Sequence, residues 1–235
     1  MSPNPAAAPA APRMALARVP EPELMDDPAQ AQAYAEADFS EPHQAFVEHF
    51  RRRFPAFAGG RVVDLGCGPA DVTLRFARAF PRAHLLGVDG ARAMLALAQE
   101  AVARAGLEER IRFAWLRLPA PALPRGFDAV ISNSLLHHLA DPQTLWAAVG
   151  QAARPGAPVL VMDLMRPAAE AELERLVATY AAEVPEILRR DFRNSLRAAY
   201  RPEEVRAQLA QAGLGGFSVE AVSDRHLLVW GSAPG

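Results

Sequence analysis

Residues 62–69 constrain the fold of this chain more than any other stretch, because an apolar strand there ends in an acidic residue and turns on two glycines. Residues 61–65 have the apolar character of a buried strand, and from Asp71 onward apolar residues recur at the spacing of a helix. Gly66 and Gly68 lack a Cβ, so a ligand can approach the main chain closely. The segment therefore predicts a strand, a ligand-binding turn and a helix in direct succession.

Strands and helices alternate through the rest of the core. The expected order is strand 61–65, helix 71–80, strand 84–88, helix 91–105, strand 110–116, strand 127–132, helix 142–153 and strand 157–163, followed after a helical stretch by β runs at 217–222 and 226–230. This alternation is typical of a parallel sheet with right-handed crossovers. We therefore predict an α/β fold built on a doubly wound sheet with helices on both faces.

A single domain is expected to account for most of the chain. The 235 residues, of which 51% are hydrophobic, can bury one good-sized core. Residues 1–22 are rich in proline and alanine and are predicted to be disordered, which leaves residues 23–235 as the domain. Within that domain, helical sequence at 23–58 precedes the first strand, and a second helical stretch at 166–200 interrupts the alternation.

Charge and residue usage argue against several classes of protein. The net charge of −2, with both signs interspersed, supplies no positive field for nucleic acid. All 25 basic residues are arginine, so no lysine can act as a base. The one cysteine, Cys67, excludes a disulfide framework and fits a reducing compartment. No apolar run has the length of a membrane span, and residues 1–12 lack a signal-peptide core, so a cytoplasmic enzyme is expected.

The glycine turn suggests two kinds of cofactor, and the charges around it favour one. A dinucleotide-binding G-x-G-x-x-G turn has a third glycine and places a pyrophosphate at the helix N-terminus. Here Asp71 stands at the third position, and Asp64 flanks the same turn. Two carboxylates would repel a diphosphate but attract a ligand that carries an ammonium and a sulfonium. S-adenosylmethionine (SAM) is such a ligand, and a nicotinamide oxidoreductase is disfavoured.

Three motifs in order resemble those of class I SAM-dependent methyltransferases, in particular small-molecule members of the quinone-biosynthesis type. They are DLGCG at 64–68, GVD at 87–89 and FDAVISNSLLHHL at 127–139, within a likeness that runs from about residue 60 to 163. The resemblance implies a Rossmann-like sheet of seven strands, mostly parallel, with an antiparallel C-terminal strand. It also implies SAM as methyl donor, S-adenosylhomocysteine (SAH) as product and no metal ion.

The same resemblance assigns roles around the donor. Asp89 would accept hydrogen bonds from the ribose hydroxyls, and Gly90 would let adenine lie against the backbone. Asp64 would lie near the ammonium of the methionine part. The remaining donor contacts would come from Gly66, Cys67, Gly68, Asn133 and Ser134. For Cys67 itself, an apolar spacer beneath the cofactor is favoured over a reactive thiol.

One position departs from the family pattern. Many relatives carry an acidic residue after the third strand that binds the adenine amino group, whereas this chain has Arg117 there. Adenine would then be recognised by main-chain groups near Arg117 and Leu118. A solvated charge at the end of the strand is an equal alternative for Arg117.

Two adjacent histidines follow the fourth strand, beside the reactive end of the donor. A hydroxyl acceptor benefits from a general base, which suggests histidine, while an amine or thiolate needs little help. Neighbouring residues point in different directions, so we expect His138 to face the acceptor and His137 to serve structure. Tyr34, in the leading helices that cover the donor site in the family, is a further candidate. A shared metal ion is not expected, because no cysteine or acidic cluster joins the histidines in the sequence.

The acceptor is expected to be a small molecule, with the methylated atom (O, N, S or C) left open. Methyltransferases of DNA bases or glutamine have an Asn-Pro-Pro-Tyr-like motif where this chain has Asn133 and the residues after it. The helical stretch 166–200, an insertion beside the mouth of the site, offers Asp191, Arg193, Asn194 and Ser195 as polar groups that could orient an acceptor. A non-catalytic SAM-binding or regulatory protein on the same fold is the alternative, and no oligomeric state is implied.

Overall fold

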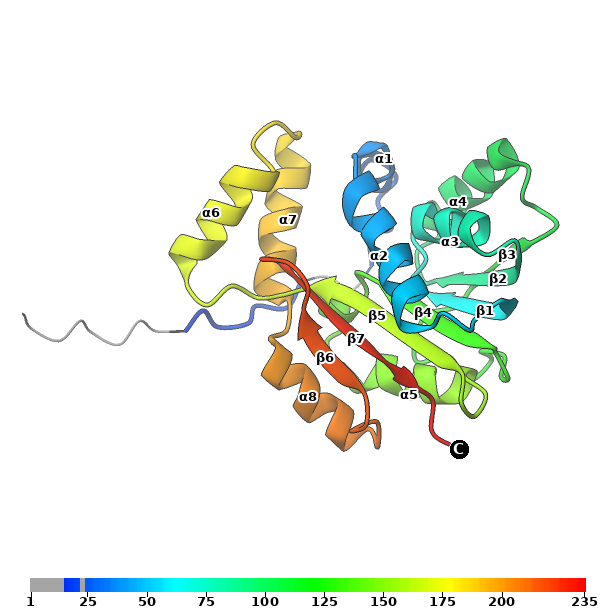
Figure 1. The fold of residues 1–235 in the computed structure, drawn as a ribbon. Coiled ribbons are helices and arrows are strands. Elements are labelled where there is room, and N and C mark those ends of the chain that lie inside the picture. Colours follow the sequence, from blue (N-terminus) through cyan, green and yellow to red (C-terminus); the bar gives the residue numbers. More distant parts are fainter. Residues whose placement is uncertain (1–14, 22–23) are drawn as a thin grey trace, which may run out of the picture.

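The computed structural model describes residues 15–21 and 24–235. Its core is one sheet of seven strands in the order β3-β2-β1-β4-β5-β7-β6, with helices on both faces (Figure 1). The strands are β1 (Gly59–Leu65), β2 (Arg82–Asp89), β3 (Ile111–Trp115), β4 (Ala129–Asn133), β5 (Pro158–Leu164), β6 (Ser218–Ala221) and β7 (His226–Ser232). All neighbours from β3 to β5 pair in parallel, and β7 runs antiparallel to both β5 and β6. The predicted fold class is confirmed.

The strand order reverses between β1 and β4. The chain builds outward from β1 to β3 and then returns to place β4 on the other side of β1. In open α/β sheets, ligands bind beyond the carboxyl ends of the strands at such a point. Asp89 and Asn133 are the last residues of β2 and β4, and Asp64 is the second-last residue of β1. The topology therefore gathers these polar residues at one edge of the sheet.

Eight helices and one 3₁₀ turn accompany the sheet among the described residues. They are α1 (Pro28–Glu36), α2 (Ser40–Arg53), α3 (Asp71–Ala79), α4 (Arg92–Ala105), η1 (Leu136–His138), α5 (Gln143–Ala152), α6 (Glu170–Tyr180), α7 (Glu186–Ala198) and α8 (Pro202–Gln211). Two features stabilise the start of α1. Pro28 occupies its first turn, and the Asp27 side chain caps the helix by accepting a hydrogen bond from Gln30 N. None of these helices is long and apolar enough to cross a membrane.

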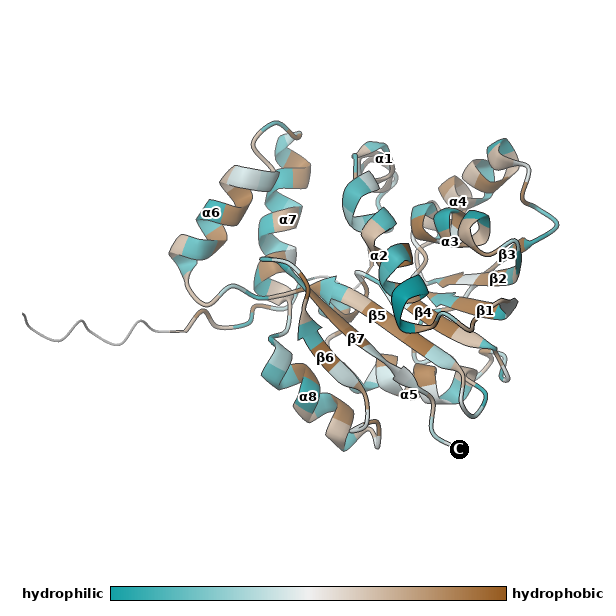
Figure 2. Cartoon of the chain, viewed as in Figure 1, coloured by the Kyte–Doolittle hydropathy of each residue, from teal (hydrophilic) through white to brown (hydrophobic). Residues whose placement is uncertain are grey.

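Successive residues of a strand point to opposite faces of the sheet and contribute to two separate hydrophobic cores. Val62 points to the face covered by α2 and α3, where the rings of Phe50 and Phe76 meet at a centroid distance of 4.8 Å. Val63 points to the opposite face, which α5 and α8 cover and where Trp146 is fully buried. The central strands are hydrophobic along their length (Figure 2). Burial on both faces explains why β1, β4 and β5 read as continuous apolar runs in the sequence.

The helices α6 and α7 form a separate layer beyond the carboxyl end of β5, away from the body of the sheet (Figure 1). Leu173, Leu176 and Leu196 are fully buried in a small core between them. These helices make up most of the stretch 166–200, where the alternation of strands and helices breaks in the sequence. Because α7 lies against η1, the unit borders the carboxyl edge of the sheet.

Residues 15–21, which we call the N-terminal strap, correct one expectation. The proline-rich composition predicts disorder up to residue 22, yet the strap hydrogen-bonds to both ends of the α6–α7 unit, through Leu16 N to Ala168 O and Val19 N to Arg197 O. Arg18 adds hydrogen bonds from its guanidinium and stacks on Tyr200, with its Cζ 4.0 Å from the ring centroid. These partners are remote in sequence and leave no mark on local composition. The expected disorder of residues 1–14 and 22 lies outside the described residues.

Arg18 gives a direct test of strap docking. Its guanidinium donates to Ala198 O at 2.6 Å and to His137 O and Leu139 O at 3.2 Å each. Arg18→Ala leaves these carbonyls without the charged donor and should lower the free energy of unfolding by about 1–3 kcal/mol in urea titrations. Arg104→Ala, which removes an exposed i,i+4 ion pair, is the control and should change it by less than about 0.5 kcal/mol. Equal effects would contradict the docked strap.

Candidate active site

The turn after β1 forms one wall of a cavity at the carboxyl edge of the sheet. Gly66 and Gly68 have φ angles of +71° and +51°, in the left-handed region that favours glycine. The amides of Gly66 and Cys67 both donate to Val88 O, at 2.8 and 3.1 Å, which joins the turn to β2. A Cβ on Gly68 would meet nothing within 4 Å, so open space lies against the backbone there. The cavity encloses about 1010 Å³, counted to its open mouth.

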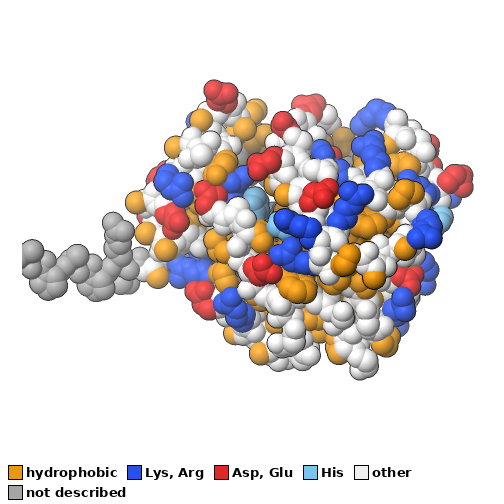
Figure 3. Space-filling model, in the orientation of Figure 1, with side chains coloured by type: hydrophobic (Ala, Val, Ile, Leu, Met, Phe, Trp, Pro, Cys, Tyr) orange, Lys and Arg blue, Asp and Glu red, His pale blue; other side chains and the backbone are white. Residues whose placement is uncertain are grey.

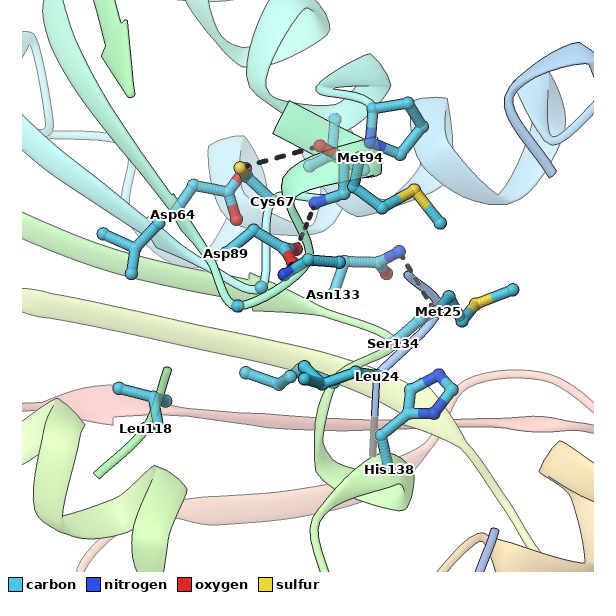
Figure 4. Close-up of a pocket in the computed structure, with 18 of the residues that line it drawn as sticks. Leu24, Met25, Asp64, Cys67, Asp89, Met94, Leu118, Asn133, Ser134 and His138 are labelled. Atoms are coloured by element: carbon cyan, nitrogen blue, oxygen red, sulfur yellow. Dashed lines mark hydrogen bonds between the residues drawn. The ribbon is translucent and has the colours of Figure 1, made fainter. Parts of the chain in front are cut away.

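Asp89 stands between the turn and the start of α4. Its Oδ2 accepts from Gly68 N at 2.9 Å and its Oδ1 from Ala91 N at 2.8 Å (Figure 4). Burial raises the pKa of Asp89, an effect that these backbone hydrogen bonds partly offset. Each carboxylate oxygen keeps a second lone pair, so a ligand in the cavity can still donate to Asp89.

Asp64 lies deeper, at the floor of the same cavity. It is 1% exposed, and Oδ2 accepts from the Thr73 hydroxyl at 2.6 Å. Burial raises the pKa of Asp64 to about 7, with a smaller contribution from the nearby Asp89 carboxylate. Cys67 lies beside it, and burial together with Asp64 raises the pKa of the thiol well above its usual value. Cys67 is therefore a neutral, apolar part of the wall, as expected, and not a reactive thiolate.

The opposite end of the cavity lies between β2 and β3. A Cβ on Gly90 would come within 2.8 Å of Leu24 Cδ2 and 3.5 Å of Arg117 Cβ, so Leu24 packs closely against the backbone of Gly90 and leaves no room for a side chain there. Gly90 O accepts from Trp115 Nε1 at 2.9 Å, which fixes the backbone at this position. Arg117 and Leu118 line the cavity.

Asp71 distinguishes this turn from a dinucleotide site. It is the first residue of α3 and lines the cavity, where Oδ2 accepts from His43 Nδ1 at 2.7 Å and from Arg75 Nε at 2.8 Å. Burial alone would raise the pKa of Asp71, but the hydrogen bonds from His43 and Arg75 outweigh it and lower the pKa below its usual value. A permanent carboxylate at a helix N-terminus opposes a diphosphate at that place.

The leading helices contribute Tyr34 and His43 to the cavity lining, whereas Asp38 and Phe39, from the same region, do not reach it. Burial, followed by the charges of Asp163, Asp71 and Asp89, raises the pKa of Tyr34 to about 12. Tyr34 therefore stays protonated near neutral pH, and its phenol can donate a hydrogen bond but cannot act as a base. Apolar side chains complete the wall, namely Leu24, Met25, Met94, Leu116, Leu135 and Leu139.

The segment after β4 lies across the cavity from the glycine turn. His138 extends from η1 toward Ser134 and Met25 (Figure 4), and Asn133 Nδ2 donates to Ser134 Oγ at 3.2 Å. Ser134 holds a φ of +56°, which is strained for a residue with a side chain. Asn133 Oδ1 is buried and accepts no hydrogen bond from any described residue, so the site presents an unused acceptor.

His137 turns away from the cavity and is buried at 2% exposure. Its Nδ1 donates to Asp163 Oδ1 at 2.5 Å, while Asp163 Oδ2 accepts from Leu136 N at 2.7 Å. Burial lowers the pKa of His137, but the Asp163 carboxylate outweighs burial and raises it overall. The expectation that His137 serves structure agrees with this position, and Asp163 is a partner that sequence spacing did not reveal.

Glu21 of the strap is the functional residue that sequence reasoning missed. Its Oε1 lies 3.5 Å from His137 Nε2 and 3.3 Å from His138 Nδ1. The sequence indicated no cysteine or acidic cluster beside the two histidines, and the fold brings one acidic residue to them from 116 residues upstream in the chain. No motif or spacing around Glu21 signals this contact.

These three side chains also bring one potential metal ligand each within 4.8 Å of one another. The contacts of these three side chains argue against a bound metal ion at this place. Glu21 Oε1 already accepts from Ser195 Oγ at 3.0 Å, and His137 Nδ1 is taken up by Asp163 Oδ1 at 2.5 Å. We therefore treat the cluster as a group of ionisable side chains in close proximity.

The polar residues expected from the α6–α7 unit divide into two groups. Ser195 reaches Glu21, and Asp191 Oδ2 accepts from Gln30 Nε2 at 2.8 Å, which links α7 to α1. Arg193 turns outward to an ion pair with Glu174. Neither these residues nor Asn194 line the cavity, so the insertion acts on the site through the strap and α1.

The fold and this edge of the sheet define a Rossmann-like nucleotide-binding architecture, and comparison with known proteins narrows it. Residues 63–159 match the methyltransferase domain family. The chain is 34% identical over 133 residues to a trans-aconitate 2-methyltransferase from Variovorax paradoxus, covering 57% of this chain and 49% of that protein. It is 32% identical over 117 residues to a ubiquinone biosynthesis O-methyltransferase from Methylococcus capsulatus, covering 50% and 48%. The chain thus spans about half the length of these two curated relatives.

Solved structures extend the likeness to nearly the whole fold. A SAM-dependent methyltransferase from Aquifex aeolicus superposes with a TM-score of 0.65 at 18% identity, covering 88% of this chain and 98% of that one. A plantazolicin methyltransferase in complex with SAH superposes with a TM-score of 0.66 at 13% identity, covering 89% and 92%. The chain therefore has the fold of SAM-dependent methyltransferases, and residues 63–159 within it match the methyltransferase domain family.

Asp64 predicts an unusual dependence of stability on pH. Its pKa is about 7 in the folded state against an ordinary value of 3.8, so the unfolded chain loses this proton first as pH rises. Ionising Asp64 therefore destabilises the fold progressively up to about pH 7. In urea unfolding, Asp64→Asn should be more stable than the unmodified protein at about pH 8, and the gain should shrink toward about pH 5.

A matched control separates this effect from general charge removal. Glu108→Gln removes an exposed carboxylate and should show the same pH dependence as the unmodified protein. A gain for Asp64→Asn that does not vary with pH would contradict a raised pKa for Asp64.

Proposed function

We propose that this protein transfers the methyl group of SAM to a small-molecule acceptor and releases SAH. The observation that carries the proposal is the carboxylate of Asp89, held by two backbone amides between the glycine turn and α4 at the switch point of the sheet. This is where the family holds its donor. The relatives named above support a methyltransferase reaction, and the geometry of the site supports SAM as the donor.

The residues of the cavity suit the parts of SAM one by one. Asp89 would accept from the ribose hydroxyls, and the adenine would lie at the end of the cavity that Gly90, Arg117 and Leu118 line. Asp64 would face the methionine ammonium, whose charge lowers the cost of ionising a buried carboxylate. The unused Asn133 Oδ1 offers a further acceptor on the methionine side. The lining has an acidic character that suits a cationic ligand.

When bound, SAM supplies an activated methyl group on a sulfonium. The chain contributes position and the exclusion of water, which are the main sources of acceleration for such a displacement. Leu24, Met25 and Leu135 provide apolar walls, while Tyr34 offers a hydrogen-bond donor on the lid side. His138, on the side of β4, would take a proton from the acceptor.

This arrangement favours a small acceptor that carries a hydroxyl or another protic group. The site is a cavity with an open mouth, and His138 is the histidine of its polar lining on the η1 side. Acidic and basic side chains are intermixed on the face seen in Figure 3, without a large basic patch. We therefore propose a small molecule and not nucleic acid as the acceptor. A cytoplasmic location stays a prediction.

Donor identity can be tested by calorimetry. SAM and SAH should bind, whereas NAD should not, because Asp64 and Asp71 oppose a diphosphate. Asp89→Ala should weaken SAM binding by about 1.5–3 kcal/mol, the range for hydrogen bonds to a charged group. Circular dichroism should report an intact fold, since the substitution lies at a strand end. Tighter binding of NAD, or an unchanged dissociation constant for the variant, would reject the assignment.

The role of His138 can be tested once an acceptor is found by labelling a metabolite extract with methyl-labelled SAM. His138→Ala should lower turnover by about a hundredfold and leave SAM affinity nearly unchanged, because one proton-transfer group is lost. If His138 only positions the acceptor, KM should rise instead and His138→Gln should restore activity. Binding of SAM without release of SAH for any acceptor would favour the regulatory alternative.

A further inference from the structure

Glu21 occupies an unusual position for a residue at the chain's N-terminal end. Its side chain is only 10% exposed and is held by Ser195 of α7, whose hydroxyl donates to Oε1 at 3.0 Å. The same oxygen lies 3.5 Å from His137 Nε2 and 3.3 Å from His138 Nδ1, and the two rings stack with their centroids 4.2 Å apart. The carboxylate is thus placed beside both histidines by three separate parts of the chain.

The strap that carries Glu21 is anchored next to the histidines themselves. Arg18 donates to the carbonyl oxygens of His137 and Leu139, which flank His138 in η1. Arg166 and Arg201 each donate to Leu16 O at 3.1 Å, at the far end of the strap. These contacts give the strap a fixed register against η1, and the position of Glu21 follows from that register.

The two histidines have different acidic partners. Asp163 is committed to His137, because its carboxylate accepts from His137 Nδ1 and from the backbone amides of Leu136 and Leu164. His138 Nδ1 instead faces Glu21. Among the described residues, the charge of Arg18 on the strap also acts on His137, and the charge of Asp191 on α7 acts on Glu21.

We propose that Glu21 is a positioning residue for methyl transfer, which fixes the ring of His138 with the proton on Nδ1 so that Nε2 serves as the base. The inference rests on the proposed function. A carboxylate that accepts from one ring nitrogen sets the tautomer and raises the basicity of the other, as in catalytic His–carboxylate pairs. Burial raises the pKa of Glu21, and the charge of His137 opposes part of that rise.

The proposed methyl transfer requires no reactant other than the methyl donor and the acceptor. An acceptor oxygen forms a bond to the methyl carbon, and the bond from that carbon to the donor sulfur breaks, with its electron pair left on sulfur. The acceptor proton moves to His138 Nε2. The resulting imidazolium faces the Glu21 carboxylate, which stabilises the new charge until the proton passes to solvent.

Nuclear magnetic resonance of the full chain tests the coupling without any acceptor. With labelled histidine and His138→Ala for assignment, Glu21→Gln should lower the pKa of His138 by about one unit and reduce the Nδ1–H tautomer, because an opposite charge is lost. Glu108→Gln, the exposed control, should change neither. Ser195→Ala, which frees Oε1 from its anchor, should produce a smaller shift in the same direction. An unchanged pKa and tautomer in folded Glu21→Gln would overturn the inference.

Kinetics supply the second test once an acceptor is known. Glu21→Gln should lower kcat by about tenfold to a hundredfold, leave KM for SAM within about twofold and move the acid limb of the kcat profile to lower pH. In a His138→Ala background the same change should cost nothing further, because the pair acts as a unit. Additive losses would show that Glu21 serves stability and would overturn the positioning role.

The two tests separate failure of this inference from failure of the proposed function. Methyl transfer with no effect of Glu21→Gln on the His138 ring would overturn the role of Glu21 alone. A ring that responds to Glu21→Gln in a protein that methylates no acceptor would overturn the proposed function, and the catalytic meaning of Glu21 with it.

Discussion

The carboxylate of Asp89 is the interaction on which the site depends. It receives one backbone amide from the turn after β1 and another from the start of α4, so it joins two crossover connections that would otherwise be independent. The turn itself is tied back to β2 through Val88 O. These bonds fix the glycine backbone at the place where the strand order reverses, and every other wall of the cavity is built around that fixed edge.

The carboxylates at this edge of the sheet are buried away from water. Asp64 and Asp89 lie close together in a buried setting, and burial raises the pKa of both. Charged groups in such a setting are costly unless they are paired. Thr73 and the backbone amides satisfy part of that demand inside the protein. A cationic ligand would supply the remaining favourable interactions. The same two carboxylates would therefore lower the stability of the ligand-free protein and favour binding of the cationic donor.

The sequence was sufficient to predict the sheet and to bring Asp64, Asp89 and Asn133 to one edge of it, because both follow from local rules. Period and apolar runs locate strands, and residues at strand ends meet at one edge of a parallel sheet. The acceptor side was not accessible in this way. Glu21 reaches His138 only through the register of the strap, and Asp163 reaches His137 across two neighbouring strands. Pro-rich composition even favoured the opposite conclusion for residues 15–21, since hydrogen bonds to remote carbonyls have no local signature.

The strap, α1 and the α6–α7 unit lie outside residues 63–159, the part that matches the methyltransferase domain family. Asp64, Asp89 and His138 therefore lie inside the matching region, while Leu24, Tyr34 and Glu21 reach the site from outside it. Under the proposed function, the segments outside the match would influence the acceptor, whereas the carboxylates proposed for the donor belong to the matching core. A change in these outer segments could then alter the acceptor while Asp64 and Asp89 stay in place.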